Sequence, residues 1–457
     1  MNKEALVQLA AGISGSVISA EDGGYDAARS VWNGAIDKKP ALVVSCLGAA
    51  DVVEAVDFAR SHSLGVSVRS GGHHVAGSAV LDGGLVVDVS HLRRVEVDPA
   101  TGRVRAEGGA QIGDVDRATQ AHGLAVPLGV VSETGVAGLT LAGGYGWMRR
   151  KHGLSCDNVV AADLVTADGR ELHVSAEQHP ELFWALRGGG WDLGVVTALE
   201  YQAHPVGPDV YLPFLTYPLS EGPQVLANLR EFARAAPRGF GSLAVCWTFP
   251  EADPFPEELW GKPFVGVAGP YVGDVDEGQR VCAPLSDLGT VLTDLGGVVP
   301  WVDAQRLFDE DYPRGRRYYW KSSHLNDLSA EAATTLVDLA ARRPSPLTSL
   351  DVWINGGAIA DVPAGDTPVG NRAAPYMIGI EANWDDPAAD RTNIDWAREA
   401  ATALRPYSKG GAYLNFDDLS DPDAARLAHG ANYDRLMEVK RSYDPANLFR
   451  SRTGPTG

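Results

Sequence analysis

Cysteine is scarce in this chain. Its 457 residues include four cysteines, which lie far apart in the sequence: Cys46, Cys156, Cys246 and Cys282. They form no CxxC pair, and no histidine lies near them at the spacing of a zinc site. The sequence therefore predicts neither a metal site nor a disulfide framework. Reduced and mostly buried thiols are expected, as in a cytoplasmic protein.

Long apolar runs and clusters of basic residues are also missing. No stretch of about 18 apolar residues occurs, so a membrane-spanning helix is not expected. The N-terminal segment MNKEALVQLAAGISGS is broken by Gln, Gly and Ser, unlike a secretory signal. The formal net charge is −20, which disfavours nucleic acid as a partner. We therefore expect a cytoplasmic monomer or homodimer that acts on a small molecule, without membrane or nucleic acid.

Glycine, in contrast, is abundant, and it gathers in the segments RSGGHHVAG, GVAGLTLAGGYG and RGGGWDLGVVT. Glycine lets a ligand approach the main chain, and successive N–H groups in such turns can hold a pyrophosphate. None of the three segments ends in the Gly-Lys-Ser/Thr of a phosphate-binding loop or fits the GxGxxG of a dinucleotide fold. Taken singly, each is as well explained by a plain tight turn.

The order of predicted elements indicates an α+β protein with two lobes. Residues 40–123 alternate short β-branched runs (ALVVSC, GVSVRS, GGLVVDVS, RRVEVD, GRVRAEG) with the helical pattern AADVVEAVDFARSHS. The segment NVVAADLVTADGRELHVS predicts two strands joined by a turn. After Pro205 to Pro208 the strands become longer and more aromatic and alternate with amphipathic helices. This change indicates a second lobe with one broad antiparallel sheet and helices on one face.

Alternation along the strands of the second lobe shows which side chains share a face. In SLDVWINGG, the residues Asp351, Trp353 and Asn355 point away from the apolar set. In YMIGIEANW, the residues Glu381 and Asn383 do so, and in GAYLNF Tyr413 and Asn415 share a face. These polar and aromatic faces form either one wall of a pocket or a solvent-facing surface, and the strands alone favour neither.

A combination of motifs narrows the choice of family. SVRSGGH, GVVSETGVAGLTLAGGYGWMRRKHGLSCDNVVAADLVTADG, ELFWALRGGG with GVVTALEYQAHPVGP, and SYDPANLFR together resemble the berberine-bridge-enzyme-like branch of the vanillyl-alcohol-oxidase flavoproteins. The resemblance implies a PCMH-type FAD-binding domain of two α+β subdomains at 1–205. It also implies a substrate domain at 206–417 with a large antiparallel sheet covered by helices, and a segment 418–457 that returns to the FAD-binding domain.

The resemblance also implies which residues hold the cofactor. The histidine of RSGGH carries one covalent 8α bond to FAD, and in this chain it is His73. The remaining cofactor positions implied are Arg69, Ser70, Gly71, Gly72, His74, Gly77, Ser78, Thr134, Gly135, Gly138, Gly144, Tyr145, Val196, Asn415 and Asn447. For His74 an ordinary polar loop role is the alternative to a role at the flavin.

The chain departs from the family at several positions. Val131 replaces a cysteine that forms a second flavin link in many members, so a single link is predicted, and Cys156 is expected to be a buried thiol. Leu139 replaces a histidine near flavin N1. Trp191 and Asp192 replace the usual Gly-Asn and leave the contacts on the adenine side open.

Flavin chemistry requires a base for the substrate proton, because the flavin itself accepts hydride at N5. The resemblance implies two candidates, Glu381 on a strand where relatives place an acid and Tyr413 in a Tyr-x-Asn motif. A structural hydrogen bond is the alternative for each. Candidate substrate contacts are Trp32, Trp353, Asn355 and Asn383, with Tyr319, Trp320 and Lys321 as weaker ones.

Three functions follow from this reading. The first is an FAD-dependent oxidase that removes hydride from a C–H next to O or N of a small molecule and passes the electrons to O₂. The second is a dehydrogenase or oxidative cyclase of natural-product biosynthesis that uses the same site. The third is a flavoprotein that sequesters a drug-like molecule without turnover.

Overall fold

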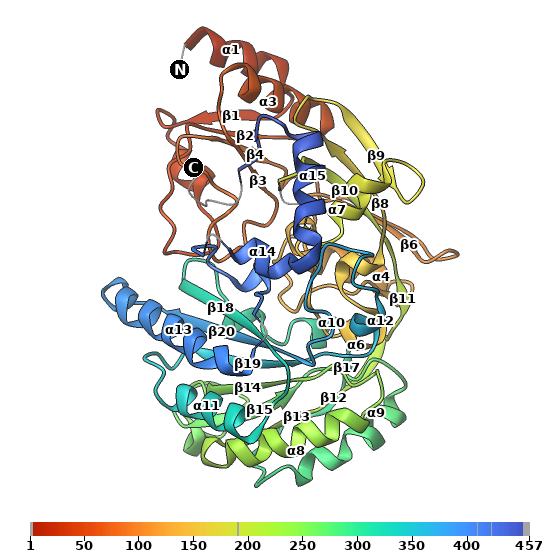
Figure 1. Ribbon diagram of the computed structural model, residues 1–457, viewed down its shortest axis with the longest axis vertical. Coiled ribbons are helices and arrows are strands. Elements are labelled where there is room, and N and C mark those ends of the chain that lie inside the picture. Colours follow the sequence, from red (N-terminus) through yellow and green to blue (C-terminus); the bar gives the residue numbers. More distant parts are fainter. Residues whose placement is uncertain (1–2, 190–191, 409, 422, 451–457) are drawn as a thin grey trace.

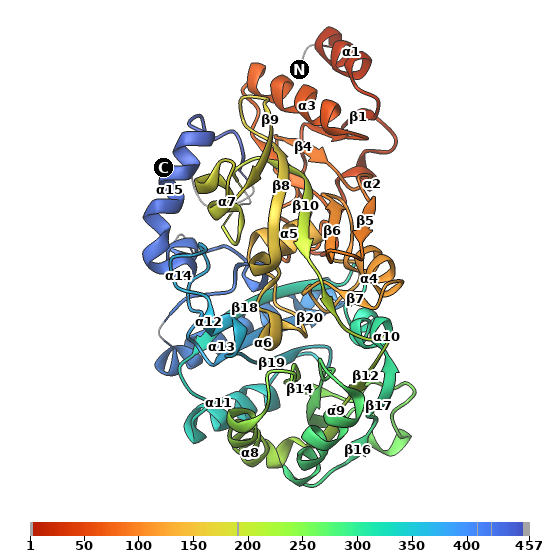
Figure 2. The ribbon, with the colours of Figure 1, turned by 90° about the vertical axis from the view of Figure 1, so that its right-hand side faces the viewer.

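Three β-sheets follow one another along the long axis of the molecule (Figure 1). The computed structural model describes residues 3–189, 192–408, 410–421 and 423–450. The two smaller sheets form the end that holds the N-terminus, and the largest sheet forms the opposite end (Figures 1 and 2). The mixture of helices and sheets confirms the predicted α+β class.

The first sheet is built from the short β-branched runs near the N-terminus. Its strands are, in spatial order, β1 (Ser16–Ser19), β2 (Leu42–Ser45), β4 (Leu85–Asp88) and β3 (Val66–Arg69). β2, β4 and β3 are parallel, and helix α3 (Ala49–Ser61) crosses between β2 and β3. The strands β2 and β4 are wholly buried, which explains their continuous apolar runs. β3 ends at Arg69, directly before the first glycine-rich turn.

The second sheet is antiparallel, and the third glycine-rich segment leads into its central strand. Its strands are, in order, β5 (Val95–Asp98), β6 (Arg103–Glu107), β10 (Val195–Gln202), β8 (Val159–Val165) and β9 (Glu171–Ser175). β8 and β9 form the predicted hairpin, in which Gly169 adopts a φ of +82°.

The third sheet has seven antiparallel strands. In order they are β16 (Thr293–Asp294), β13 (Phe214–Pro218), β15 (Pro263–Ala268), β14 (Leu243–Thr248), β19 (Ser349–Ile354), β20 (Tyr376–Trp384) and β18 (Arg317–Leu325). The helices α8 (Gly222–Ala235), α11 (Ala330–Ala341) and α13 (Asp390–Leu404) bury one face of this sheet. The opposite face points toward the first two sheets (Figure 1). The predicted broad sheet with helices on one face is thus confirmed.

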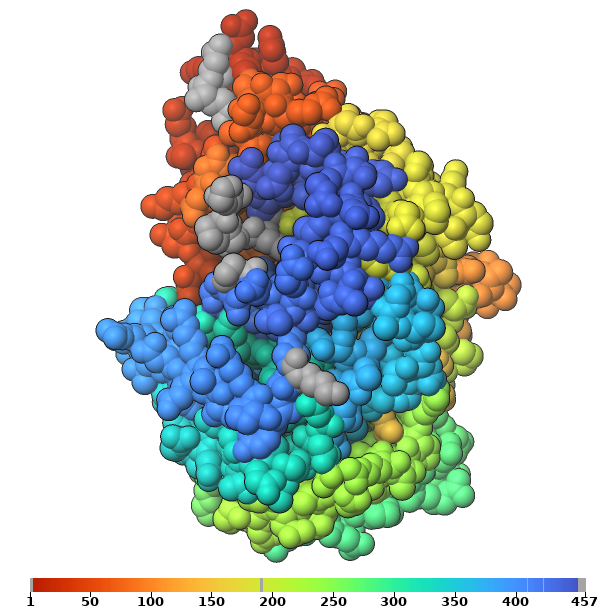
Figure 3. Space-filling model, viewed as in Figure 1, coloured from red at the N-terminus to blue at the C-terminus, as the bar shows by residue number. Residues whose placement is uncertain are grey.

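The C-terminal segment returns to the first sheet. Helices α14 (Ala424–His429) and α15 (Tyr433–Tyr443) lie over the front of the upper lobe (Figure 3). Beyond them the chain runs parallel to β3, where Val66 N donates to Leu448 O and Arg450 N donates to Val66 O. Residues from both ends of the chain therefore build the same sheet.

Shorter elements connect these layers. The remaining helices are α1 (Lys3–Gly12), α2 (Tyr25–Arg29), α4 (Ile112–Gln120), α5 (Val136–Leu141), α6 (Arg149–His152), α7 (Pro180–Leu186), α9 (Val275–Cys282), α10 (Trp301–Gln305) and α12 (Ala358–Asp361). Two small ribbons pair β7 (Leu124–Ala125) with β11 (His204–Pro205) and β12 (Asp209–Leu212) with β17 (Gly297–Pro300). Within the described chain no helix is long and apolar enough to cross a bilayer.

One segment differs from its sequence pattern. GAYLNF was expected to alternate like a strand, but it forms a 3₁₀ turn over Leu414–Phe416. The turn folds back, so that the side-chain amide of Asn415 donates to the hydroxyl of Tyr413 at 2.8 Å. The two side chains therefore do lie together, through a turn rather than through the alternation of a strand.

Candidate active site

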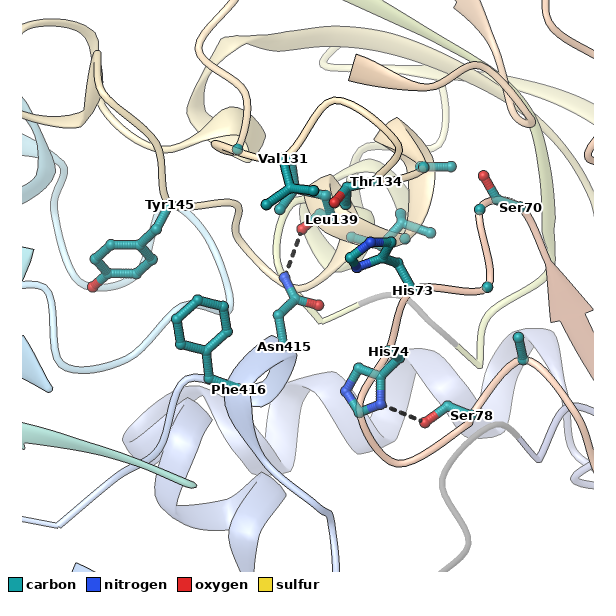
Figure 4. A pocket seen from close by; sticks show the side chains of 18 of the residues that line it. Ser70, His73, His74, Ser78, Val131, Thr134, Leu139, Tyr145, Asn415 and Phe416 are labelled. Atoms are coloured by element: carbon teal, nitrogen blue, oxygen red, sulfur yellow. Dashed lines mark hydrogen bonds between the residues drawn. The ribbon is translucent and has the colours of Figure 1, made fainter. Parts of the chain in front are cut away.

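A cavity of about 1350 Å³, counted together with the open space at its mouth, lies where the three sheets meet. The first glycine turn, the loop and helix around residues 129–141, the 413–416 turn and the inner face of the large sheet form its walls. Figure 4 shows His73 and Thr134 on one side of this space and Tyr145 and Phe416 on the other. Segments from all parts of the chain thus converge on one site.

The two glycine-rich segments touch at the floor of the cavity. A Cβ on Gly71 would lie 2.5 Å from the backbone N of Gly135, so neither segment could approach the other with a larger residue there. Gly72 adopts a φ of +66°, which favours glycine. The turn after β3 therefore presents the next residue, His73, toward the cavity.

His73 has a ring nitrogen that is left without a partner among the described residues of the cavity. Its Nε2 atom is buried and has no hydrogen-bond partner among the described residues. Burial, together with the nearby Arg314 guanidinium, lowers the pKa of His73 to about 3, so the imidazole is neutral at physiological pH. Trp32 stacks on the ring with centroids 4.2 Å apart. The ring is thus held in one orientation, and its Nε2 atom is left for a ligand.

His74 has a different environment. Its Nε2 lies 2.9 Å from Leu414 O, and its Nδ1 lies 3.0 Å from the hydroxyl of Ser78 (Figure 4). Burial lowers the pKa of His74 to about 4. His74 therefore joins the glycine turn to the C-terminal side of the cavity.

The second glycine-rich segment, which includes helix α5, forms another wall of the cavity. A Cβ on Gly138 would meet no atom within 4 Å, so this residue borders empty space. Next to it, Leu139 O accepts a hydrogen bond from the Asn415 amide at 3.0 Å (Figure 4). Val131, in place of the family's second cysteine, and Thr134 also line the cavity. At Gly144, by contrast, φ is +87° and a Cβ would clash with Ser155, so that glycine serves the turn itself.

Two carboxyl groups lie on the large sheet at the other end of the cavity. Asp351 on β19 and Glu381 on β20 are diagonal neighbours, because Asp351 pairs with Gly379. Tyr312 OH donates to Glu381 Oε2 at 2.6 Å. Burial raises the pKa of Asp351 to about 7, and burial together with Asp351 raises the pKa of Glu381 well above its usual value. Both acids therefore hold their protons to a higher pH than an ordinary carboxyl group does.

Tyr413 lines the cavity directly before the 3₁₀ turn over Leu414–Phe416. Its hydroxyl accepts hydrogen bonds from Tyr145 N at 3.1 Å and from the Asn415 amide at 2.8 Å. Burial raises the pKa of Tyr413 to about 12, even though these two bonds lower it. The phenol is therefore protonated at neutral pH, unlike the ionised form that a ready base would need.

Most of the predicted cofactor and substrate residues line the cavity. The lining includes Ser70, Gly71, Gly72, His73, His74, Ser78, Thr134, Gly135, Gly138, Tyr145, Val196, Trp353, Glu381, Tyr413 and Asn415, with Trp320 from the weaker set. Residues up to 345 positions apart in the sequence are thus brought together, from Ser70 to Asn415.

Several predicted residues lie outside the lining but support it. Arg69 pairs with Asp88 at 2.5 Å at the end of β3, and Gly77 adopts a φ of +60° in the turn behind His74. Trp32 lies behind His73, and its indole N–H donates to Tyr312 O at 2.9 Å. Asn447 occupies an exposed turn with a φ of +50°.

The remaining predicted substrate contacts bind protein groups. Asn355 donates to Ala374 O, and Asn383 accepts from the indole of Trp320 at 2.7 Å. Tyr319 accepts from Arg398, and the ammonium of Lys321 pairs with Asp417 and Asp418. Each of these four side chains therefore makes at least one contact with a protein group, and Asn355 Oδ1 has no hydrogen-bond partner among the described residues.

Of the positions at which the sequence differs from the family pattern, the structure describes all but Trp191. Trp191 lies outside the described residues, and Asp192 O accepts a hydrogen bond from the Lys440 ammonium at 2.7 Å. Cys156 is a buried free thiol, as are the other three cysteines. Burial raises the pKa of Cys156, so it is not a reactive thiolate.

Sequence reasoning missed Asp351 and Tyr312 as site residues. The alternation in SLDVWINGG placed Asp351 on the same face as Trp353, and a carboxylate on a face that also holds an aromatic was the available signal. Tyr312 comes from the loop before β18, where no periodicity indicates which way a side chain points.

The cavity fits a flat cofactor with a diphosphate. His73 Nε2 and Ser70 Oγ are buried polar atoms without partners among the described residues, and the open side of Gly138 leaves room at the second glycine segment. Main-chain N–H groups of the glycine turn suit an anionic group. These features meet the requirements for FAD.

Comparisons with known proteins agree with this geometry. A family model for an FAD-binding domain matches residues 40–175, and a berberine and berberine-like model matches residues 412–454. The (R)-6-hydroxynicotine oxidase of Paenarthrobacter nicotinovorans is 32% identical over 96% of each chain. An FAD-linked oxidoreductase of Dictyostelium discoideum is 30% identical over 92% of this chain and 90% of its own.

Solved structures show the same fold over almost the whole chain. The crystal structure of 6-hydroxy-D-nicotine oxidase from Arthrobacter nicotinovorans has a TM-score of 0.85 at 30% identity and covers 97% of this chain and 98% of its own. A chitooligosaccharide oxidase has a TM-score of 0.84 at 23% identity, with 99% and 100% covered. The chain therefore belongs to the berberine-bridge-enzyme-like family of FAD-linked oxidoreductases.

Proposed function

We propose that this protein is an oxidase with FAD bound covalently to His73, and that it oxidises a C–H bond next to O or N of a small molecule. The observation that carries this proposal is the buried, unpartnered and neutral imidazole of His73 at the edge of the cavity. When bound, FAD supplies a hydride acceptor that O₂ can reoxidise to give H₂O₂. The hydroxynicotine oxidase relative supports O₂ as the acceptor.

The chain's own groups would divide the remaining work. The glycine turn, with Ser70 and Ser78, would hold the diphosphate, and Thr134, Gly138, Tyr145 and Asn415 would border the ring system. Glu381 is the better base, because the phenol of Tyr413 has a pKa raised to about 12 and accepts two hydrogen bonds. Tyr413 would then orient substrate and Asn415 instead of accepting the proton.

The domain limits 1–205, 206–417 and 418–457, a cytoplasmic location and a monomeric or dimeric state remain part of this proposal. The contact of the C-terminal segment with β3 supports the limits. The free cysteines of the described chain agree with a reducing compartment.

Covalent attachment is tested by acid precipitation of the purified protein. The yellow chromophore is expected to stay with the washed pellet of the wild type and to be lost from the pellet of His73→Ala. His74→Ala is the matched control and is expected to keep the chromophore. A colourless wild-type pellet, or one that stays yellow in His73→Ala, would contradict the tether.

Oxidase activity is tested by a substrate screen with H₂O₂ detection. A compound that bleaches the flavin without O₂ and yields H₂O₂ with O₂ confirms the proposal. Bleaching that an artificial acceptor reverses and O₂ does not would assign a dehydrogenase instead.

A further inference from the structure

Among the described residues, no lysine, arginine or histidine forms an ion pair with the two carboxyl groups on the large sheet. Asp351 is 5% exposed and Glu381 is 2% exposed, and both line the cavity. Asp351 Oδ1 is buried without a hydrogen-bond partner among the described residues. A carboxylate buried away from any cation is costly, so a ligand group that supplies a positive charge would be strongly favoured here.

The surrounding charges do not compensate the pair. The described lining of the cavity contains neither lysine nor arginine. His73 and His74 have pKa values lowered to about 3 and 4, so both are neutral. Arg149 lies behind the wall, 5.0 Å from the Trp353 ring, and donates to main-chain carbonyls of Gly146, Gly241, Ser242 and Ile354. The pair therefore faces the cavity as its acidic end.

Aromatic rings border the same end. Tyr312 and Trp320 lie with ring centroids 5.6 Å apart, Trp320 and Phe416 5.1 Å apart, and Phe416 and Trp353 6.3 Å apart. The faces of such rings attract a cation and exclude water from it. Acids and aromatic faces at one end of a cavity are the chemistry that recognises an alkylammonium group.

We propose that Asp351 and Glu381, with the rings of Tyr312, Trp320, Trp353 and Phe416, bind a protonated amine, so that the substrate class of the proposed oxidase is amines. This inference rests on the proposed function for turnover but concerns binding by these residues alone. A neutral hydroxyl could form a hydrogen bond with the pair but would leave its negative charge uncompensated.

The same pair can prepare the amine for oxidation. When the ammonium contacts an ionised carboxylate, its N–H bond breaks, an O–H bond forms on the carboxyl group, and the nitrogen keeps the electron pair. No oxidant or reductant takes part in this step. The neutral amine, with its lone pair free, is the form from which hydride can leave.

The test compares three probes of one shape on the holoenzyme at neutral pH: benzylamine, which is cationic, benzyl alcohol, which is neutral, and benzoate, which is anionic. Binding is followed by the anaerobic flavin spectrum and by tryptophan fluorescence, to which Trp320 and Trp353 contribute. Benzylamine is expected to bind at least tenfold more tightly than benzyl alcohol, and benzoate most weakly. An equal or reversed order overturns the proposal.

Variants show whether the pair causes the preference. In Asp351→Asn and in Glu381→Gln the ratio of the two dissociation constants is expected to fall at least fivefold. Asp116→Asn is the matched control, because Asp116 is a buried acid outside the cavity lining that hydrogen-bonds to Gln305. It removes the same charge from the acidic protein and is expected to keep the full ratio. Retention of the ratio in both cavity variants overturns the proposal.

General attraction to an acidic protein is excluded by repeating the comparison at about 1 M NaCl, where charges farther apart than roughly 3 Å are screened. A cation bound between the pair and the rings keeps most of its preference there, and complete loss of the preference overturns the site. A yellow protein without cation preference contradicts this inference and leaves the oxidase proposal intact. A colourless protein contradicts the covalent flavin, while the fluorescence ratio still decides the cation site.

Discussion

At the scale of single residues, the surroundings of a side chain decide its chemistry more than its type does. His73 and His74 are adjacent in the sequence, and burial lowers the pKa of both. Yet both ring nitrogens of His74 form hydrogen bonds, with Leu414 O and with the Ser78 hydroxyl. Nε2 of His73, in contrast, has no partner in the described structure. Of the two, only His73 therefore combines a neutral ring with a ring nitrogen that no described residue hydrogen-bonds.

Trp32 should control how well His73 reacts with the cofactor. It lies between the rings of His73 and Tyr318, with centroids at 4.2 Å and 3.6 Å. Trp32→Ala removes this support and leaves a void, at a cost of about 3–5 kcal/mol in the free energy of unfolding. The fraction of acid-stable flavin in the folded protein is expected to fall severalfold, as measured by absorbance of the denatured pellet and supernatant.

Trp32→Phe distinguishes ring support from mere stability. It keeps a ring against His73 and loses only the bond from the indole N–H to Tyr312 O. Most of the covalent flavin should therefore return in this variant. Equal flavin loading in wild type and Trp32→Ala would show that the stack has no such positioning role.

The pH dependence of flavin reduction should follow the carboxyl pair. Because the pKa of Asp351 is raised to about 7 and that of Glu381 is raised as well, the pair is protonated in acid and can accept a proton only as pH rises. The rate constant kcat/KM is therefore expected to rise up to tenfold per pH unit below about 7 and then to level off. Anaerobic bleaching by a reducing compound from the screen measures it.

The titratable neighbours of the pair determine in which direction a variant shifts the rising part of the pH profile of kcat/KM, which is called the acid limb here. Asp351 raises the pKa of Glu381, and Tyr312, Asp311, Cys246 and Tyr318 are the other titratable groups facing the two acids. Asp351→Asn removes the repelling charge, so the limb should move to lower pH. The control Asp116→Asn should leave it in place. A limb that does not move in Asp351→Asn would assign the titration to another group.

At the scale of elements, turns position His73 and Asn415, and strands of the large sheet position the two acids. The turn after β3 presents His73, and the 3₁₀ turn over Leu414–Phe416 presents Asn415. The strands β19 and β20 present the acids through plain alternation on a sheet whose other face is buried by helices. Strand side chains are thus predictable from the sequence, whereas turn side chains require the fold.

The turn after α15 should be a stability determinant of the C-terminal return. Asp444 is 2% exposed and accepts hydrogen bonds from Leu448 N at 2.7 Å, Phe449 N at 2.9 Å and the Lys440 ammonium at 2.5 Å. Asp444→Ala leaves these donors unpaired, at a cost of about 2–4 kcal/mol. The midpoint of thermal unfolding should fall by several degrees.

Asp434 on the same helix is the matched control, because its side chain is 82% exposed and its contact with Arg426 is long at 3.3 Å. Asp434→Ala should change the free energy of unfolding by less than about 0.5 kcal/mol. Similar losses in both variants would mean that the buried turn is not the source of the stability.

At the scale of the whole molecule, the cavity exists only because the two lobes are fixed to each other. Asn33 joins them: its amide donates to Val75 O at 2.6 Å and Tyr318 O at 2.9 Å, and its carbonyl oxygen accepts from Tyr318 N at 3.1 Å. The first contact lies beside the histidine turn and the others on strand β18. This buried side chain is therefore one of the contacts that hold the histidine turn against strand β18.

Asn33→Ala should therefore weaken the lobe contact and the site together. Three buried groups lose a partner, which costs about 2–5 kcal/mol in the free energy of unfolding by denaturant. Flavin fluorescence should rise or shift as water enters the cavity. The exposed Asn326, whose contact with Tyr407 O is 3.5 Å, provides the control Asn326→Ala, for which no change is expected. Unchanged unfolding in Asn33→Ala would show that other contacts fix the lobes.

The sequence by itself determined the α+β class, the large antiparallel sheet and the faces of its strands, because periods of two and of 3.6 residues are local properties of the chain. Its glycine and histidine motifs also sufficed to indicate FAD and His73. Only the tertiary structure decided that Asp351 and Tyr312 join Glu381, that Trp32 supports His73 from behind, and that Asn355 and Asn383 bind protein groups. These pairings connect residues far apart in the chain, and the packing of one lobe on the other brings them together.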